Sequence, residues 1–348
     1  MTIAPARVIR ALRLSIFAAC AAGFMLSPDA TSAQTLARVK QRGFVTCGVS
    51  QGLPGFSTPG DDGAWTGIDV DLCRALAAAI FNDATKVRFV GLPAKDRFSA
   101  LQTRQIDVLS HDTTWTLSRD ASLGLNFTGV TYYDGQGFMV RKSLQVKSAA
   151  ELDGASVCTQ TGTTTELNAA DFFKTNHMKY EIVAFESPDE TVKAYESGRC
   201  DAFTNDISSL FAQRQKLAHP DQHVILGDVL SKEPLGPAVR QGDDEWFSIV
   251  KWTLFAMIDA EELGISSLNL DQAMTSEKPE IRRFLGVEGD HGTRLGLTRD
   301  WCARIVRLVG NYGEIFDRNV GAKSKLQIPR GLNRLWTQGG IQFAPPIR

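Results

Sequence analysis

The sequence predicts a two-lobed α/β protein in which each lobe is a mostly parallel sheet flanked by helices. In a first run, strand-like and helix-like segments alternate: strands at 44–49, 87–90 and 106–109, with helices at 68–81 and 96–102. The pattern then restarts: strands at 155–158, 180–184, 201–204 and 224–226, with helices at 163–174, 188–196 and 206–217. A β-α-β-α-β run implies parallel strands with helices on the faces of the sheet.

Two short segments rich in glycine or proline, 132–141 and 233–240, flank the second run. We expect them to cross between the lobes as a hinge, so that the second unit is inserted into the first. Lobe 1 would then comprise residues 34–138 and 238–348, and lobe 2 residues 139–237. The part of lobe 1 after the hinge opens with a long amphipathic helix at 243–263 and continues as a mostly helical C-terminal extension.

Residues 1–33 are typical of a secretory signal. Its positive charges are Arg7, Arg10 and Arg13. An apolar run, Leu14–Leu26, follows, and small residues lead to Ala33, after which we expect cleavage. The run is shorter than the roughly 20 residues of a spanning helix. The alternatives are a buried N-terminal helix and a lipid anchor at Cys20, although Cys20 lies inside the apolar run. The sequence therefore predicts export to the periplasm.

The composition disfavours several classes of partner. The 348-residue chain has a net charge of −1, and without the signal it would have 315 residues and a charge of −3. Because no basic field is present, we expect neither nucleic acid nor an anionic membrane as a partner. The histidines are scattered and no two cysteines have CxxC spacing, so we expect no metal and no cofactor. We expect a monomer.

Six stretches of the mature chain carry a resemblance to a known family. They are Gly63–Asp71 (GAWTGIDVD), Ser110–Arg119 (SHDTTWTLSR), Leu123–Tyr133 (LGLNFTGVTYY), Gln160–Thr165 (QTGTTT), Gly198–Asp201 (GRCD) and Asn311–Glu314 (NYGE). In this order and spacing they resemble the type II periplasmic solute-binding proteins of polar amino-acid ABC transporters, most closely the general L-amino-acid branch. The resemblance implies a periplasmic protein that binds free L-amino acids, with broad specificity, and delivers them to the permease subunits of an importer.

A free amino acid offers a carboxylate and an ammonium, and a binding protein must replace the water around both. A guanidinium matches the carboxylate with two parallel N–H donors, and Arg119 follows the third strand, where α/β proteins bind ligands. The resemblance implies that Arg119 clamps the ligand carboxylate, with help from the Thr114 hydroxyl. It also implies backbone N–H groups near Thr164, in the segment that starts at Thr161. The alternatives are a surface Arg119 paired with Asp120 and ordinary helix capping by Thr163 with Glu166.

The resemblance assigns the ligand ammonium to the carboxylate of Asp206 and to the backbone carbonyl of Asp112. The alternative for Asp206 is an N-cap of the following helix. His111 and Asp112 replace the basic residue and Asn that are usual in this branch, which leaves side-chain preference open, and an added carboxylate would favour cationic ligands. Alternatively, His111 and Asp112 pair on the surface. Ser50 is expected to face the ligand side chain, and Trp115 to form an apolar wall.

The mature chain has five cysteines, and export makes disulfides reasonable. Cys47 on the first strand and Cys73 on the next helix are expected to meet by βα packing. Cys158 and Cys200 are expected to meet in the second lobe. Both bridges would stay within a lobe, and Cys302 would remain unpaired.

Two other functions remain open at this point. One is an enzyme on the same fold, such as a cyclohexadienyl or arogenate dehydratase or a peptidoglycan lyase, for which His111–Asp112 is the single supporting feature. The sequence has no GxSxG motif, and no other histidine falls near the expected site, so we expect no catalytic residues. The other is an amino-acid-sensing receptor module with the same ligand contacts.

Overall fold

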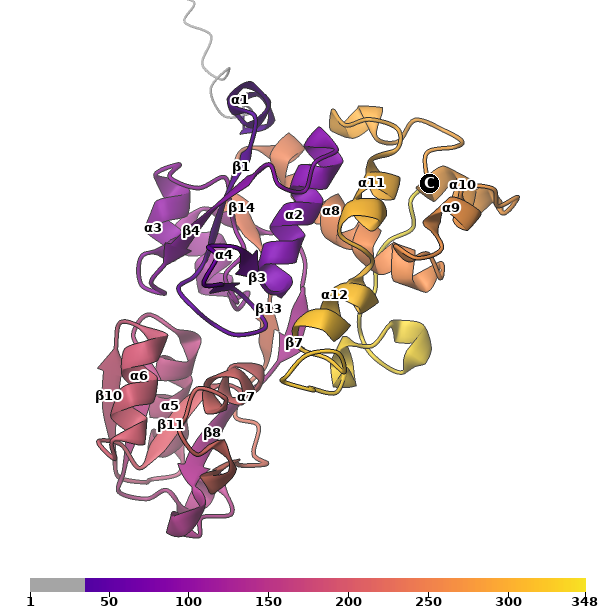
Figure 1. Ribbon diagram of the computed structural model, residues 1–348. Helices are drawn as coiled ribbons and strands as arrows, with labels where there is room; N and C mark the ends of the chain where they lie inside the picture. Colours follow the sequence, from indigo (N-terminus) through magenta and orange to yellow (C-terminus); the bar gives the residue numbers. More distant parts are fainter. Residues whose placement is uncertain (1–34) are drawn as a thin grey trace, which may run out of the picture.

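The computed structural model of the chain describes residues 35–348, so the predicted signal at 1–33 lies outside the described residues. Figure 1 shows two bodies, one above the other, joined by the strands β7 (Tyr132–Asp134) and β13 (Glu233–Leu235). Two predicted helices, α2 (Ile68–Phe81) and α6 (Pro188–Glu196), have the bounds that the sequence predicts.

The first lobe is built on a five-stranded sheet with the order β4-β1-β5-β14-β6. Its strands are β1 (Val45–Ser50), β4 (Val87–Leu92), β5 (Val108–Leu109), β6 (Leu125–Phe127) and β14 (Ala238–Arg240). Strand β1 runs parallel to β4 and β5 on its two sides. The helices packed around this sheet are α1 (Thr35–Arg42), α2, α3 (Arg97–Gln102) and α4 (Leu117–Leu123), and a two-stranded ribbon, β2 (Thr58–Pro59) with β3 (Trp65–Thr66), lies beside them.

The second lobe repeats this plan with the order β10-β9-β11-β8-β12. Its strands are β8 (Gln136–Arg141), β9 (Ala155–Gln160), β10 (Tyr180–Phe185), β11 (Ala202–Asp206) and β12 (His223–Ile225). Its helices are α5 (Thr164–Thr175), α6 and α7 (Ile207–Arg214). Strand β9 runs parallel to β10 and β11.

Each sheet is mostly parallel, as the sequence predicts, and contains one strand of opposite direction, β14 in the first lobe and β8 in the second. Strand β14 is antiparallel to β5 and β6, and β8 is antiparallel to β11 and β12. The reason is the path of the chain, because β8 and β14 are the continuations of the two crossing strands and enter each sheet from the other lobe. A pattern read along the sequence does not register the direction in which such a strand arrives.

The two crossing strands form a small antiparallel ribbon of their own. Strand β7 pairs with β13, with Tyr133 opposite Pro234. Because these strands are the covalent links between the two sheets, the ribbon positions one lobe against the other.

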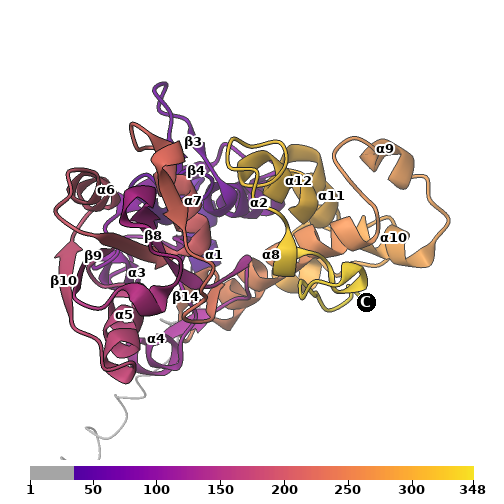
Figure 2. The ribbon, with the colours of Figure 1, turned by 90° about the horizontal axis from the view of Figure 1, so that it is seen from below.

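The segment after β14 packs on the first lobe. Its helices are α8 (Asp244–Glu262), α9 (Leu270–Ala273), α10 (Pro279–Phe284), α11 (Trp301–Leu308) and α12 (Tyr312–Asn319). Helix α11 packs against α2 and α8, so the extension shares the large apolar core of the first lobe. Figure 2 shows α9 and α10 on the side of the molecule away from α5 and α6. After α12 the chain has short 3₁₀ turns only, so the extension is less helical than expected there.

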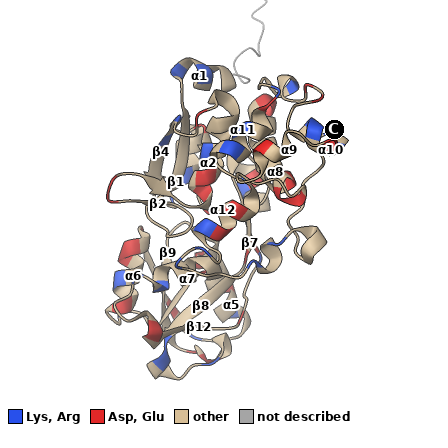
Figure 3. Cartoon of the chain, turned by 45° about the vertical axis from the view of Figure 1, so that its right-hand side comes forward, with Lys and Arg blue, Asp and Glu red and all other residues tan. Residues whose placement is uncertain are grey.

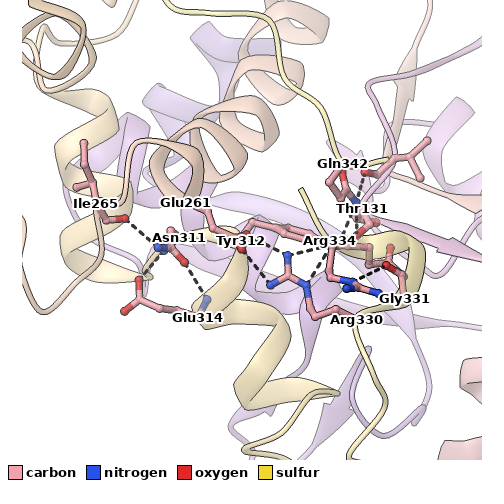
Figure 4. Close-up of polar contacts among 12 residues, drawn as sticks. Thr131, Glu261, Ile265, Asn311, Tyr312, Glu314, Arg330, Gly331, Arg334 and Gln342 are labelled. Atoms are coloured by element: carbon pink, nitrogen blue, oxygen red, sulfur yellow. Dashed lines mark hydrogen bonds and ion pairs between the residues drawn. The ribbon is translucent and has the colours of Figure 1, made fainter. Parts of the chain in front are cut away.

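This extension also contacts the hinge ribbon, and Figure 4 shows Tyr312 and Gln342 beside Thr131, the residue before β7. The side chain of Asn333 accepts from the Tyr133 N–H at 2.7 Å and donates to its carbonyl at 3.0 Å, as a neighbouring strand would. The Tyr133 backbone groups face away from β13, since Pro234 opposite it directs its own carbonyl to the Trp115 N–H at 2.8 Å, so Asn333 satisfies groups that the ribbon itself leaves unpaired. Nearby, the Tyr312 hydroxyl donates to the Thr131 carbonyl at 2.8 Å.

The structure brings both expected cysteine pairs within bonding distance. Cys47 is joined to Cys73, with Cα atoms 6.3 Å apart, and Cys158 to Cys200, with Cα atoms 5.6 Å apart. Each bridge lies within one lobe, so neither restrains the hinge. Cys302 is buried and free, and burial raises the pKa of its thiol well above the ordinary value.

We expect Asn333→Ala to destabilise the protein by about 1–3 kcal/mol, because two backbone groups of Tyr133 lose their partners. In a thermal unfolding scan the midpoint should fall by several degrees, on the order of 2–4 °C per kcal/mol. Gln338→Ala is the matched control, since Gln338 is an exposed amide in the same segment. Equal midpoints for the two variants would contradict the role given to Asn333.

Candidate functional site

A cavity lies between the lobes, at the carboxyl ends of the central strands. It encloses about 510 Å³ of empty space, counted with its open mouth. The first lobe contributes Ser50, Leu92, Ala94, Arg97, His111, Asp112 and Thr114, and the second lobe contributes Gln160, Thr163, Thr164, Asn205, Asp206 and Gln213. Ser50, Gln160 and Asp206 are the last residues of β1, β9 and β11. Ligand sites of α/β proteins lie at such strand ends.

Two buried arginines supply the positive charge of the site. Arg97 is 4% exposed, lines the cavity and has no partner for its Nε. Arg119 is 7% exposed and donates from Nη1 to the Thr114 carbonyl at 2.8 Å. Both guanidinium groups lie over the ring of Phe98, at 4.9 and 5.2 Å. The surface pairing of Arg119 with Asp120 is wrong, because Arg119 is buried and Asp120 accepts from Trp115 instead.

Burial lowers the pKa values of both arginines. Burial, followed by the charge of Arg119, lowers the pKa of Arg97 to about 9. Burial also lowers the pKa of Arg119. Both remain cations at neutral pH, and a bound anion would stabilise their charged forms.

Asp206 faces the arginines from the other lobe. It is 5% exposed, and its Oδ1 has no hydrogen-bond partner. Although it precedes α7, its side chain makes no capping bond, so the N-cap alternative is wrong. Burial, then the nearby carboxyl of Asp112, raises the pKa of Asp206 well above its ordinary value. This carboxyl group is therefore available to a cation that enters the cavity.

Asp112 contacts the second lobe. Its Oδ2 accepts from the Ser209 hydroxyl at 3.4 Å, while its Oδ1 is buried without a partner. Its backbone has φ 51°, a left-handed conformation that Asp and Asn tolerate better than most residues. Burial and the charge of Asp69 raise the pKa of Asp112 well above its ordinary value.

His111 does not pair with Asp112 on the surface, which corrects that alternative. It is 4% exposed, and its Nε2 donates to the Leu92 carbonyl at 2.8 Å. Its Nδ1 then faces Arg97 Nη1 at 3.4 Å as an acceptor. Burial and the charge of Arg97 lower the pKa of His111 to about 3, so the ring is neutral.

A third carboxyl group, that of Glu233 on the hinge strand β13, joins the lobes. Its Oε2 accepts from the hydroxyls of Thr114 at 2.6 Å and Thr164 at 3.0 Å, one from each lobe. Its Oε1 accepts from Asn168 at 2.8 Å and from Ser231 at 2.5 Å. The two threonine hydroxyls are themselves 3.2 Å apart.

Two more carboxyl groups lie behind the cavity. Asp69, at the start of α2, accepts from the Ser110 hydroxyl at 3.0 Å, and burial raises its pKa to about 7. Asp134, at the end of β7, accepts from the backbone and hydroxyl of Ser208, and burial raises its pKa to about 6. The acidic groups thus extend from the cavity to the hinge.

Of the remaining predicted site residues, one lines the cavity and two do not. Ser50 lines the cavity, and its hydroxyl lies 2.8 Å from the Ser57 hydroxyl. The N–H of Thr161 donates to the Phe185 carbonyl at 2.8 Å, and Thr161 does not line the cavity. Trp115 is 40% exposed and stacks on Phe127 with ring centroids 5.7 Å apart, so it is no cavity wall.

Helix α5 begins at Thr164 and is capped by Thr163. Thr163 caps α5 by accepting from the Glu166 N–H at 3.2 Å, as the capping alternative expects. The Glu166 carboxylate turns to the Gly162 N–H at 3.0 Å and not to Thr163. The cap uses a side chain, so it leaves the N–H of Thr164 free to meet an anion at the helix start.

Sequence reasoning missed Arg97, Gln213 and Glu233. Arg97 follows Asp96 at a predicted helix start and reads as a surface charge. Gln213 reads as the polar face of a helix, although it is 1% exposed. Glu233 offered one signal, since it is an acid in an otherwise apolar crossing segment.

Acidic and basic residues are mixed along α6 and α12 in Figure 3. Over residues 35–348, no helix is long and apolar enough to cross a membrane. The same residues contain no group of three or more His, Cys, Asp or Glu side chains that could hold a metal ion.

The raised pKa values predict how stability depends on pH. Asp69 and Asp134, and Asp259 in the extension with a pKa of about 7, bind protons in the folded state at a pH where the unfolded chain has lost them. Their stabilising contribution is complete below pH 4 and is lost as pH rises through about 6 to 7. His111 acts in the opposite sense, but mainly below its unfolded pKa of about 6.5.

We therefore expect the thermal midpoint of the dialysed protein to fall between pH 6 and pH 7.5, with a slope of about 1.4 kcal/mol per pH unit for each net proton. Asp69→Asn should flatten this slope, because it removes one of the titrating groups. Calorimetry across the interval is the measurement. A midpoint that rises with pH, or an unchanged slope in the variant, would contradict the assignment.

Comparisons with known proteins place this geometry in a family. Residues 45–265 match the family "Bacterial extracellular solute-binding proteins, family 3". The chain is 58% identical to the general L-amino acid-binding periplasmic protein AapJ of Rhizobium johnstonii, over 94% of this chain and 97% of that protein. It is 48% identical to the glutamate/glutamine/aspartate/asparagine-binding protein BztA of Rhodobacter capsulatus, over 97% of this chain and 100% of that protein.

A solved structure agrees over nearly the whole fold. An ABC transporter periplasmic binding protein from Brucella ovis, with glutathione bound, superposes with a TM-score of 0.89. It is 54% identical to this chain and covers 91% of it and 100% of that chain. The matched residues span both sheets and the crossing strands. The chain therefore belongs to the bacterial extracellular solute-binding proteins of family 3.

Proposed function

We propose that this protein binds free L-amino acids in the cavity between its lobes and delivers them to an ABC importer without changing them. The observation that carries the proposal is the pair of opposed buried charges, Arg97 and Arg119 in one lobe and Asp206 in the other. A zwitterion has opposite charges on neighbouring atoms and fits such an arrangement. The names of AapJ and BztA support amino acids as the ligand class.

We place the ligand carboxylate on the side of the cavity next to Arg97 and Arg119. The donors on this side are the guanidinium groups and the backbone N–H of Thr164 at the start of α5. The Thr114 hydroxyl already donates to Glu233 at 2.6 Å, so it serves the ligand as a donor only when that bond breaks. Arg97 lines the cavity, so we assign the ligand carboxylate to its guanidinium group. Arg119 is not part of the cavity lining, and from behind Thr114 it adds positive charge to this side of the site.

The ligand ammonium belongs at Asp206, whose Oδ1 lacks a partner, and at the backbone carbonyl of Asp112. Each charge-assisted hydrogen bond contributes about 1.5–3 kcal/mol. Four or five of them, less the loss of freedom on association, give about −8 to −10 kcal/mol, which is a dissociation constant of micromolar or below.

The described form is closed, with direct bonds between the lobes. Lys95 pairs with Glu186 at 2.5 Å, and Lys216 donates to the Gly52 carbonyl at 2.7 Å. We propose that residues 34–138 and 238–348 move against residues 139–237 about the β7–β13 ribbon. A ligand held by both lobes favours the closed form by its differential affinity. We further propose that permease subunits recognise this closed form.

Several observations favour binding over catalysis. Both ring nitrogens of His111 have partners, and its pKa of about 3 makes it a poor base at neutral pH. The dehydratase alternative therefore lacks the acid–base group on which it depended. We propose that residues 1–33 direct the chain to the periplasm and that it acts there as a monomer, with no nucleic acid, metal or cofactor.

Isothermal titration with each proteinogenic L-amino acid tests the proposal. We expect several L-amino acids to bind and the D-enantiomers to bind much more weakly. Arg119→Ala and Asp206→Ala should each weaken binding by about a hundredfold, because each leaves an opposite charge buried without its partner. Arg294→Ala is the control, since Arg294 is exposed and distant from the cavity.

The alternatives give different results in the same assay. Normal binding by either cavity variant would mean that the site is misplaced. Glutathione should be titrated as well, because the Brucella ovis protein carries it. Binding of glutathione with no free amino acid would overturn the proposal, as would turnover of prephenate or arogenate.

A further inference from the structure

The cavity and its walls contain more carboxyl groups than cations. The acids are Asp69, Asp112, Asp134, Asp206 and Glu233, and the cations are Arg97 and Arg119. His111 adds no charge, because burial and Arg97 keep it neutral. An amino acid with an uncharged side chain brings no net charge. Such a ligand brings no additional cation that would stabilise the ionised form of the remaining carboxyl groups.

A second observation concerns buried polar atoms that lack partners. Asp206, Ser209 and Gln213 are three and four residues apart, so they lie on one face of α7. Asp206 and Gln213 line the cavity, and Gln213 is 1% exposed with neither amide atom bonded. Asp112, whose carboxyl group contacts Ser209 on the same face, has an unpartnered Oδ1.

An unpartnered buried polar group is unfavourable unless a ligand supplies the missing bond. In the proposed function the ligand ammonium satisfies Asp206. Asp112 Oδ1 and the Gln213 amide, which also belong to the cavity lining, are then left for the ligand side chain. An aliphatic side chain leaves both unsatisfied, and a carboxylate side chain repels Asp112. A side chain that ends in an ammonium or guanidinium group supplies donors and also offsets the negative charge.

We propose that the cavity prefers amino acids with a cationic side chain, and that the side-chain carboxyl of Asp112 sets this preference. The inference rests on the proposed function, because it needs a zwitterion held between the arginines and Asp206. Asp112 is a specificity-determining residue in this account, and Gln213 holds the polar end of the ligand side chain. Burial and the charge of Asp69 raise the pKa of Asp112, as expected of a carboxyl group that awaits a cation.

L-Lysine and L-norleucine provide a matched pair of probes, since they differ by the terminal ammonium group. By isothermal titration we expect lysine to bind at least about tenfold more tightly than norleucine, and glutamate more weakly than glutamine. In Asp112→Asn the lysine-to-norleucine affinity ratio should fall to within about threefold of one. Asn suits the left-handed backbone at this position, so the variant should fold.

Asp171→Asn is the control, because it removes the same charge from an exposed position on α5 and should keep the wild-type ratio. Lysine and norleucine binding equally to the wild type would overturn this inference and leave the proposed function standing. An unchanged ratio in Asp112→Asn would overturn the role of Asp112. Failure of every amino acid to bind would instead refute the proposed function.

Discussion

The burial of opposite charges on two separate lobes is the constraint on which the rest of the structure depends. Arg97 and Arg119 belong to the first lobe and Asp206 to the second, and each is less than a tenth exposed. Removing such groups from water is costly unless each finds a partner. The Nε of Arg97 and the Oδ1 of Asp206 have none among residues 35–348. The closed arrangement is thus incomplete electrostatically, and a ligand with both charges completes it.

The two crossing strands are the connection about which we propose that the lobes close on a ligand. Both disulfides lie within lobes, and the C-terminal extension packs on the first lobe, so the covalent links between the sheets are the strands of the β7–β13 ribbon. Asn333 and Tyr312 hold the backbone of residues 131–133 from the side of the first lobe. The ribbon is therefore anchored at one end, and for the proposed closure we expect the backbone to turn near Gly135, where the ribbon enters the second lobe.

The sequence analysis succeeded where the determining contacts are local. Helix α2 was predicted from Ile68 to Phe81 because its apolar spacing is helical, and in the structure Asn82 ends it in a left-handed conformation. Asp206 was singled out because it follows a predicted strand and the family resemblance assigns it to the ligand ammonium. The opposite direction of β8 and β14 was not predicted, because it depends on the chain crossing between lobes. Gln213 and Arg97 were missed for the same reason, since the approach of the other lobe buries them.

Trp115 shows the opposite error. Its place in the motif suggested a cavity wall, yet its ring finds Phe127, twelve residues later, and stacks on it at the surface. The partner of an aromatic ring is set by tertiary packing, and neighbouring residues do not reveal it.

Glu233 links the two lobes within the protein itself. Its carboxylate lies on the hinge strand and accepts hydroxyls from Thr114 and Thr164, which belong to different lobes. These hydroxyls lie beside the place proposed for the ligand carboxylate. The Glu233 carboxylate therefore accepts hydrogen bonds that a ligand carboxylate could accept. It does not neutralise the arginines fully, because Arg97 keeps an unpartnered Nε. Glu233 therefore holds the lobes in register, while the remaining imbalance at Arg97 and Asp206 leaves ligand binding to determine how firmly they close.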